Sequence, residues 1–423
     1  MAQLTDDCFV VSGPLLPVAT VEDIIRQRIA PVAGTEQVAL ADAFGRVTAQ
    51  DVVAPINLPP FDNSAVDGYA VRHADLAPQG ETRLPVAGRV VAGRGLDVLA
   101  PGTAVRIFTG APMPQGADTV FMQEDCSVAG DTVVLPPGLG IGANRRQTGE
   151  DVRAGAVALP AGRRLGPADV ALAAALGLTM LPARRRVRVA LFSTGNEIIE
   201  PGCERPAAAL YDSNRMLLSG LLAQLGAAVT HLGILPDDVE RLAPALQAAA
   251  TTHDLVLTSG GVSVGELDHV REAVARIGRL VFWRVGIKPG RPVAMGVLSD
   301  GKTGEGAAFV GLPGNPVAAF VTFLRVVRPL LLRLAGAEIT PLMPLPVRAA
   351  FSHSKKTGRR EYLRVSLRQA ADGTVEAVKF PRDGAGILTS LTRTDGLAEL
   401  MEGVTAVSPG DTIGFLSYAT LAG

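Results

Sequence analysis

The sequence predicts a multidomain α/β protein in which a β domain precedes a central α/β domain and a small β barrel or sandwich ends the chain. The length of 423 residues provides for about three domains. The 47 glycines and 30 prolines exceed the usual combined share of about 12% and indicate turn-rich β structure. Between residues 186 and 336, strands alternate with helices, which favours parallel strands with helices on both faces.

The composition excludes several classes of protein. Apolar residues are 48% and charged residues 19%, and 40 Lys plus Arg nearly balance 41 Asp plus Glu. This balance argues against a disordered chain, a coiled coil and a protein held to nucleic acid mainly by charge. Cys8, Cys126 and Cys203 are isolated, so disulfides and zinc are not expected.

The expected location is the cytoplasm. The first thirty residues carry acidic groups early and no cationic start before an apolar run, unlike a secretory signal. The apolar stretch 316–334 is interrupted by Arg325, Arg328 and Arg333, which favours a core helix over a membrane span. We therefore expect neither a membrane nor a nucleic-acid partner.

The first half of the chain is predicted to be mainly β structure. Thr20 and Asp23 resemble a capping pair that opens a short helix ending before Pro31. Valine-rich segments with turn signals at intervals of about 8 to 12 residues predict a β domain over residues 51–149. A helix is expected over residues 166–178, with residues 181–186 as the boundary after it.

The second half is predicted to hold the α/β sheet and a final β domain. A strand over residues 186–195 is followed by an amphipathic helix with Asp212 as its N-cap, and the alternation continues to the helix after Asn315. Such sheets bind ligands outside the carboxyl ends of their strands. From residue 345 onward valine-rich strands return, and Asp372 with Gly373 predicts a hairpin turn.

Five loops of small and charged residues follow the strands of the central segment. Gly and Pro could merely turn the chain in any one loop, but five at one sheet edge favour an anion-binding site. Glycines would admit backbone N–H groups, Ser and Thr hydroxyls would donate to phosphate, and Lys288 and Arg291 would add positive charge. The loops are STGNE (193–197), PDD (236–238), SGGVSVGELD (259–268), KPGRP (288–292) and LPGNP (312–316).

Carboxylates gather in the same loops. Glu197, Asp237, Asp238, Glu266 and Asp268 would repel one another and a phosphate unless a hard cation lay between them. The expected metal is Mg²⁺, which binds one or two carboxylates plus substrate phosphates. Helix capping is the alternative for Asp237 or Asp238 and for Asp268, and for Asp238 the two interpretations weigh equally. Glu197 has no such alternative.

Two polar clusters lie outside the central segment. In PPFDNSAVDGYAVR (59–72), an Asx turn is a sufficient explanation of the local sequence. In NRRQTGED (144–151), Arg145 and Arg146 could bind an anion, although a solvated charge run is the more common arrangement. The histidines show no metal-ligand spacing.

Taken in order, seven strings resemble the molybdopterin molybdenumtransferase family, called MoeA in bacteria and represented by the E domain of gephyrin in animals. The resemblance covers nearly the whole chain. The strings are PPFDNSAVDGYAVR, TGAPMPQGAD, STGNE, YDSNR, TSGGVSVGELD, IKPGRP and GLPGNP.

The resemblance implies insertion of molybdenum from molybdate into adenylylated molybdopterin, with release of AMP. It implies an interrupted N-terminal domain (1–50 and 150–182), an inserted β domain (51–149), a central three-layer α/β domain like the molybdopterin adenylyltransferases (183–336) and a C-terminal β barrel (340–423). It also implies a homodimer whose site is shared between subunits. A molybdopterin adenylyltransferase and acceptor molybdoenzymes are possible further partners.

The family's functional positions carry over residue by residue. Asp62, Glu197, Asp268 and Lys288 would be catalytic, and Asp237, Asp268 and Glu197 would bind Mg²⁺. The substrate-binding positions would be Thr109, Arg145, Arg146, Ser193, Thr194, Gly195, Ser259, Gly260, Gly261, Ser263, Arg284, Pro289, Gly290, Arg291, Pro313, Gly314, Asn315 and Pro316.

The chain departs from the family pattern at three places. Asn196 replaces an Asp found in many members, Arg284 replaces a Lys, and GAG at 384–386 replaces a Ser-containing motif. Two alternative functions remain at this stage: a molybdopterin adenylyltransferase using Mg-ATP, and a non-catalytic scaffold like gephyrin.

Overall fold

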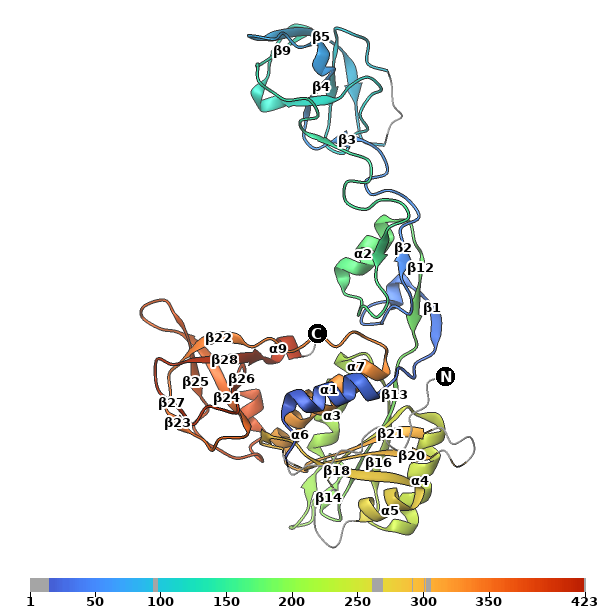
Figure 1. Cartoon of the computed structure of the whole chain (residues 1–423), viewed down its shortest axis with the longest axis vertical. Helices are drawn as coiled ribbons and strands as arrows, with labels where there is room; N and C mark the ends of the chain where they lie inside the picture. Colours follow the sequence, from blue (N-terminus) through green and yellow to red (C-terminus); the bar gives the residue numbers. More distant parts are fainter. Residues whose placement is uncertain are drawn as a thin grey trace.

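The computed structural model describes residues 15–93, 98–260, 269–290, 292–299, 301 and 306–421. The molecule is elongated (Figure 1). A β domain inserted in the N-terminal region stands at one end, and the central α/β domain and the C-terminal barrel lie side by side at the other. The expected multidomain α/β architecture is confirmed.

The N-terminal domain is built from two separate chain segments. Strand β1 (Thr35–Ala39) pairs antiparallel with β12 (Met180–Arg184), and β2 (Val52–Val53) pairs with β11 (Val157–Leu159). Helix α2 (Pro167–Ala175) packs beside them. Residues 181–186 were expected only as a boundary. That prediction was wrong because most of this stretch is β12, whose partner strand lies far back in the sequence.

The predicted capping pair is not found at the start of helix α1 (Val18–Arg28). Thr20 and Asp23 lie inside the helix, and the N-cap is Pro17, with no side-chain cap. The helix instead buries an apolar stripe that includes Val21 and Ile25 against the central domain. Tertiary packing, more than capping, stabilises a short helix of this kind.

The inserted β domain contains a six-stranded sheet of order β7-β4-β6-β5-β9-β8. A separate small ribbon joins β3 (Asn63–Ser64) to β10 (Arg145–Arg146). Short 3-10 turns are η1 (Leu40–Asp42) in the N-terminal domain and η2 (His73–Asp75) and η3 (Gln123–Asp125) here. The strands are β4 (Gly68–Val71), β5 (Thr82–Val90), β6 (Ala104–Ile107), β7 (Thr119–Met122), β8 (Ser127–Ala129) and β9 (Thr132–Leu135).

The central domain has a six-stranded sheet of order β16-β13-β17-β21-β20-β18. The first four strands are parallel, as predicted, but β20 runs antiparallel to both of its neighbours. A short connection from β20 to β21 permits only an antiparallel pair, so the predicted parallel arrangement does not extend to β20. The strands are β13 (Arg188–Thr194), β16 (Ala228–Leu235), β17 (Leu255–Ser259), β18 (Gly278–Arg284), β20 (Pro292–Ser299) and β21 (Gly306–Leu312), with β14 (Ile198–Ile199) and β15 (Leu210–Tyr211) as a separate pair.

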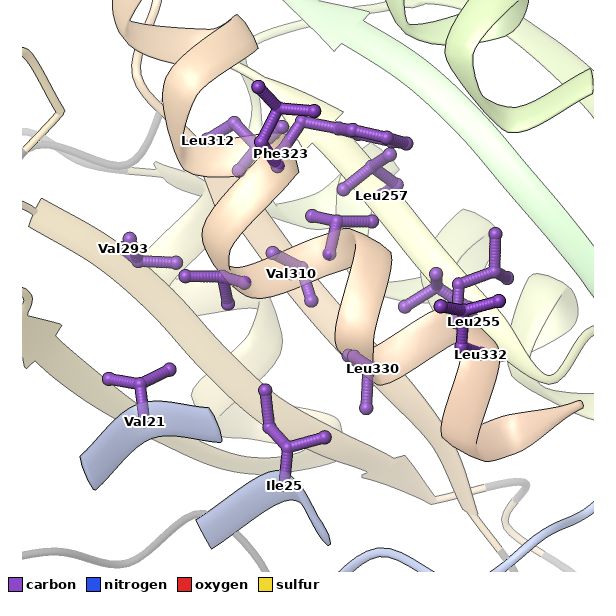
Figure 2. Packing of buried hydrophobic residues seen from close by; sticks show 14 of the residues in the cluster. Val21, Ile25, Leu255, Leu257, Val293, Val310, Leu312, Phe323, Leu330 and Leu332 are labelled. Carbon is purple, nitrogen blue, oxygen red and sulfur yellow. The ribbon is translucent and has the colours of Figure 1, made fainter. Parts of the chain in front are cut away.

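Helices cover both faces of this sheet. On one face α3 (Ser213–Gln224), α6 (Pro316–Thr322), the π-helical turn η4 (Phe323–Val327) and α7 (Arg328–Leu334) pack with α1. Figure 2 shows Val21 and Ile25 of α1 in the same apolar cluster as Val310 of the sheet and Leu330 of α7. On the other face lie α4 (Val239–Thr252) and α5 (His269–Ile277). Within the described ranges, no helix combines the length and apolar character needed to cross a membrane.

Local capping follows the sequence at two central helices. Asp212 accepts a hydrogen bond of 3.1 Å from the Arg215 backbone N–H at the start of α3, as predicted. Asp238 accepts one of 3.0 Å from Glu240 at the start of α4, so the capping alternative for Asp238 is confirmed.

The buried carboxylate of Asp254 links the amino ends of strands β13 and β17 by hydrogen bonds. Asp254, directly before β17, accepts hydrogen bonds of 2.7 Å from both terminal nitrogens of Arg185 and one of 2.8 Å from the Arg188 backbone N–H. Burial alone would raise the pKa of Asp254, but these hydrogen bonds outweigh it and hold the pKa below its usual value.

The C-terminal domain is a barrel of five strands, β24-β25-β22-β28-β26, closed by pairing of β24 with β26. The hairpin predicted at Asp372 and Gly373 joins β24 to β25, with Gly373 at φ 82°. Its elements are β22 (Leu345–Ala349), β23 (His353–Ser354), β24 (Arg360–Gln369), β25 (Val375–Lys379), α8 (Thr389–Thr392), β26 (Gly396–Leu400), β27 (Ala406–Val407), β28 (Thr412–Ser417) and α9 (Tyr418–Leu421).

Several contacts join the barrel to the central domain, among them a strand pair and a buried ion pair. The short strand β19 (Ile287–Lys288) pairs in parallel with β24. Arg325 of η4, itself buried, forms an ion pair with the buried Glu399 of β26. The Tyr362 hydroxyl donates to the same carboxylate over 2.9 Å.

Candidate functional site

A cavity of about 520 Å³ opens at the carboxyl ends of β13, β17 and β21. The topology of the sheet brings these ends together, at the edge where α/β sheets bind ligands. Gly386 and Leu388 of the C-terminal domain add a further wall. The other lining residues are Ser193, Thr194, Glu197, Ile198, Leu210, Tyr211, Asp212, Ser213, Asn214, Ser259, Gly260, Gly314, Asn315 and Pro316.

Asn214 fixes three of these segments relative to one another. Its Nδ2 donates to the Ser259 Oγ over 2.8 Å and to the Gly314 carbonyl over 2.7 Å. Asn214 lies in the first turn of α3, so the amino end of that helix, with its partial positive charge, borders the cavity. The sequence prediction did not include Asn214 as a site residue, although the YDSNR string contained it.

Three polar atoms on residues that line the cavity are buried without a hydrogen-bond partner. They are Ser193 Oγ, Thr194 Oγ1 and Asn214 Oδ1. Leaving a buried polar group unpaired costs about 1–3 kcal/mol. Such groups, gathered in one cavity, suit a polar ligand that completes their hydrogen bonds.

The Glu197 carboxylate folds back over Gly195. Gly195 has φ 141°, and a Cβ at this position would lie 2.7 Å from Glu197 Oε2. Glycine therefore makes room for the carboxylate. Of the described lining residues, Glu197 and Asp212 are acidic and none is basic, and Asp212 already pairs with Arg215 at 2.8 Å.

Lys288 lies outside this lining and contacts the barrel. Its Nζ is 2.6 Å from Oε1 of Glu361, its cross-strand neighbour in β24. The Nε2 of His353 lies 3.2 Å from the same oxygen, and Lys379 Nζ lies 3.4 Å from His353 Nδ1. Glu361 is buried, whereas the Lys288 side chain is 50% exposed. Nothing local in the sequence indicates Glu361, because the strand pairing joins distant segments.

Two glycines of the predicted anion loops serve other purposes. Gly290 has φ 109°, and a Cβ there would approach Thr322 Oγ1 of α6 to 2.3 Å, so this glycine permits close packing of the KPG loop on the helix. The Gly260 N–H donates to the Leu312 carbonyl over 3.0 Å and is not free to bind a ligand. Gly260 nevertheless lines the cavity, as do Ser259 and residues 314–316, and the Ser259 Oγ donates to the Pro313 carbonyl over 3.4 Å.

The remaining central positions divide into two groups. Asp237 Oδ1 lies 3.3 Å from His269 Nδ1 and is not among the described lining residues, and the exposed Arg284 ends β18. Across the described part of the chain, no three His, Cys, Asp or Glu residues assemble as a metal-binding group. The predicted residues Gly261, Ser263, Glu266, Asp268 and Arg291, and the loop glycine Gly265, lie outside the described residues.

The Asp62 group lies in the inserted β domain. Asp62 Oδ1 accepts hydrogen bonds of 2.8 Å from the backbone N–H and the hydroxyl of Thr148, and Arg145 Nη1 lies 3.7 Å from Oδ2. These hydrogen bonds hold the pKa of Asp62 below its usual value. Thr109 instead donates to Asp67, over 2.7 Å from N–H and 2.8 Å from Oγ1. Arg146 pairs with Asn63 in the β10–β3 ribbon.

Within one chain, the Asp62 group and the cavity are far apart. Figure 1 places the inserted β domain at the opposite end of the molecule from the central sheet. The structure therefore brings together Ser193, Thr194, Glu197, Ser259 and the 313–316 loop, and separates them from Asp62, Thr109, Arg145 and Arg146.

Comparisons with known proteins cover nearly the whole chain. The family model described as the MoeA N-terminal region (domain I and II) matches residues 16–177. The probable molybdopterin binding domain matches residues 190–333, and the MoeA C-terminal region (domain IV) matches residues 346–418.

Individual relatives extend over similar lengths. The chain is 38% identical to the molybdopterin molybdenumtransferase of Haemophilus influenzae, covering 92% of this chain and 95% of the relative. It is also 38% identical to molybdopterin molybdenumtransferase 2 of Mycobacterium tuberculosis, covering 88% and 92%. Among solved structures, the molybdopterin biosynthesis MoeA protein of Pyrococcus horikoshii OT3 is similar with a TM-score of 0.76 and 29% identity, covering 96% of this chain and 100% of that one.

Proposed function

Because the chain belongs to the molybdopterin molybdenumtransferase family, we propose that its central cavity binds adenylylated molybdopterin and that the protein inserts molybdenum from molybdate, releasing AMP. The observation that carries the proposal is the set of unpartnered polar atoms on Ser193, Thr194 and Asn214. Ser193 and Thr194 end strand β13, and Asn214 lies in the first turn of α3, all within the segment matched by the molybdopterin-binding model.

The chemistry of these atoms fits that substrate. The hydroxyls of Ser193 and Thr194 can donate to phosphoryl oxygens, and the amino end of α3 favours negative charge beside them. Asn214 Oδ1, an acceptor, can bind an O–H or N–H group of the nucleotide or pterin. The cavity of about 520 Å³ is within the usual range for small-molecule sites.

The donor set also suits Mg²⁺. Glu197 lines the same cavity as several Ser and Thr residues, no described lining residue is basic, and hard oxygen donors are those that Mg²⁺ prefers. Glu197 would hold the ion at the cavity, and the family resemblance implies Asp237 and Asp268 as its further ligands, of which Asp237 is not among the described lining residues. When bound, Mg²⁺ would neutralise phosphate charge and polarise the phosphoanhydride.

Lys288 would contribute positive charge to the reaction. Its half-exposed ammonium group, held by Glu361, would stabilise the charge that develops on AMP as the phosphoanhydride is cleaved. Such reactions depend chiefly on positioning and charge stabilisation. Lys288 would therefore affect the rate of AMP release more than substrate binding.

A second copy of the chain would complete the site. The inserted β domain, which carries Asp62, Thr109 and Arg145, lies at the opposite end of the molecule from the central sheet of its own chain (Figure 1). In a homodimer, the inserted β domain of one subunit would face the cavity of the other. Mixing an Asp62→Ala protein with a Glu197→Gln protein should then restore activity in mixed dimers, and no restoration would contradict a shared site.

The central test is molybdate-dependent AMP release by the purified protein with adenylylated molybdopterin. Glu197→Gln should lose most of this activity, whereas the matched control Glu240→Gln, on the exposed surface of α4, should keep it. Equal activity in both variants would refute the assignment of Glu197. Adenylylation of unmodified molybdopterin from Mg-ATP would support the adenylyltransferase alternative, and absence of any turnover would support the scaffold alternative.

A further inference from the structure

A second and larger cavity, of about 880 Å³, lies between three domains. It is bordered by the N-terminal domain around Phe44 and Arg164, by α7 with Arg328, and by the barrel at Phe415. It shares no lining residue with the cavity at the carboxyl edge of the sheet. The proposed molybdenum-inserting function makes no use of it.

Arg328 places a buried guanidinium group in this wall. The residue is 6% exposed, and its Nε is buried without a hydrogen-bond partner. The one described hydrogen bond of its side chain runs from Nη1 to the Thr340 carbonyl and is long, at 3.4 Å. Burial, followed by the neighbouring charges of Arg325 and Arg164, lowers the pKa of Arg328.

Arg164 is a second cation of the same wall. Its Nε is likewise buried without a partner, and its Nη2 donates only to the Gln224 backbone carbonyl. Burial lowers the pKa of Arg164 as well. Neither Arg164 nor Arg328 has an ion-pair distance to a described carboxylate, although Glu338 lies in the wall.

Neighbouring arginines differ because each has a carboxylate partner. Arg163 lines the cavity but its Nε donates to Asp169 over 2.7 Å. Arg325 pairs with Glu399 and lies 3.5 Å from Glu22. Among the described lining residues, Arg164 and Arg328 are therefore the cations without a carboxylate at ion-pair distance, and the charge of Glu22 only partly offsets the neighbouring positive charges at Arg328.

Apolar side chains form the rest of the wall. Leu332 and Phe415 are buried in it, whereas Met343 is 83% exposed and Leu345 59% exposed. A ligand with an apolar body would cover the exposed part of Met343 and Leu345. Each square ångström of apolar surface removed from water contributes about 25 cal/mol.

We propose that this cavity binds a small organic anion, with its carboxylate or phosphate group between Arg164 and Arg328 and its apolar body against Met343 and Leu345. A buried unpaired charge is unfavourable, and an anionic group accepting guanidinium hydrogen bonds removes that cost. Because the ligand would contact three domains at once, its binding would also resist their separation.

Calorimetric titration of the full-length protein with three probes tests the proposal. Octanoate combines an anionic group with an apolar chain, 1-octanol has the chain alone, and inorganic phosphate has the charge alone. Octanoate should bind more tightly than either of the others and should raise the temperature of thermal unfolding. If 1-octanol binds as tightly as octanoate, the cavity selects only for apolar groups and the proposal is overturned. The proposal is also overturned if octanoate does not bind.

Three variants identify the residues. Arg328→Met and Arg164→Gln should each weaken octanoate binding by about ten- to hundredfold, the usual effect of losing a charge-assisted hydrogen bond. The matched control is Arg163→Gln, which removes a balanced charge from the same wall and should change binding little. Equal losses in all three variants would mean that overall charge, and not the unbalanced pair, attracts the anion.

Two further measurements distinguish loss of ligand binding from loss of stability and from loss of an oligomer. Arg328→Met removes an uncompensated buried charge and keeps most of the side-chain volume, so the variant should be as stable as the parent in urea unfolding. If Arg164→Gln and Arg328→Met instead dissociate an oligomer in sedimentation velocity, these arginines belong to an interface between copies, and the small-ligand proposal is overturned.

Discussion

Replacing Thr194 by valine should separate ligand binding from stability. Thr194 Oγ1 is buried in the wall of the central cavity and has no hydrogen-bond partner in the protein. Valine has nearly the same shape, so the substitution removes no protein hydrogen bond and leaves no hole. It also removes a buried polar group whose unpaired state costs about 1–3 kcal/mol. We therefore expect the free energy of unfolding to stay unchanged or to rise.

Binding should respond in the opposite direction. A hydroxyl that donates to a charged phosphoryl oxygen contributes about 1.5–3 kcal/mol, which corresponds to a loss of about ten- to hundredfold in affinity. Affinity for AMP, measured by calorimetric titration, and stability, measured by urea unfolding, should thus change independently of each other.

The matched control is Thr258→Val. Thr258 lies on the neighbouring strand β17, and its Oγ1 is also buried without a partner, but the residue does not line the cavity. It should reproduce the stability effect and leave AMP affinity unchanged. If Thr194→Val destabilises the protein while AMP binds as before, the hydroxyl serves the fold, and the ligand assignment is refuted.

Three further predictions concern single side chains. Glu361→Gln should free Lys288 and lower the turnover number for AMP release by about ten- to hundredfold, with little change in KM, whereas an unchanged turnover number would exclude positioning by Glu361. Asp254→Asn should lower the free energy of unfolding by about 3 kcal/mol at neutral pH, because it breaks a buried ion pair. Since the folded-state pKa of Asp254 is depressed, that stabilisation is present above the unfolded-state pKa and should disappear as the pH falls below about 4; a difference that persists in acid would contradict this. Gly195→Ala should displace the adjacent carboxylate and abolish AMP release, while Gly202→Ala, which has a positive φ of 94° but open space around it, should only destabilise the protein slightly.

Local signals predicted local structure well. Asp212 and Asp238 cap helices because a cap depends only on residues two or three positions away. The valine-rich segments and the hairpin at Asp372 were predictable for the same reason. Thr20 was misread because burial of Val21 and its neighbours, a tertiary effect, sets where α1 begins.

Contacts between distant segments were not predictable from patterns. The partner of Lys288 is Glu361, 73 positions away, and only the pairing of β19 with β24 brings them together. Loop composition drew attention to Ser193 and Thr194, which line the central cavity, since strand ends of a parallel sheet converge. It could not show that the Gly260 N–H is already engaged, or that Asn214 holds the loops together.

The pairing of β19 with β24 joins the barrel to the half of the molecule that holds the central cavity. The C-terminal domain provides Glu361, which accepts a hydrogen bond from Lys288, and Gly386, which lines the central cavity. A truncated chain lacking this segment would lose the anchor of the lysine together with one side of the cavity. A hybrid protein that takes its C-terminal domain from a relative should therefore also take the KPG loop from that relative. Strand β19 of this loop pairs with β24 of the C-terminal domain, and the two strands have to fit each other.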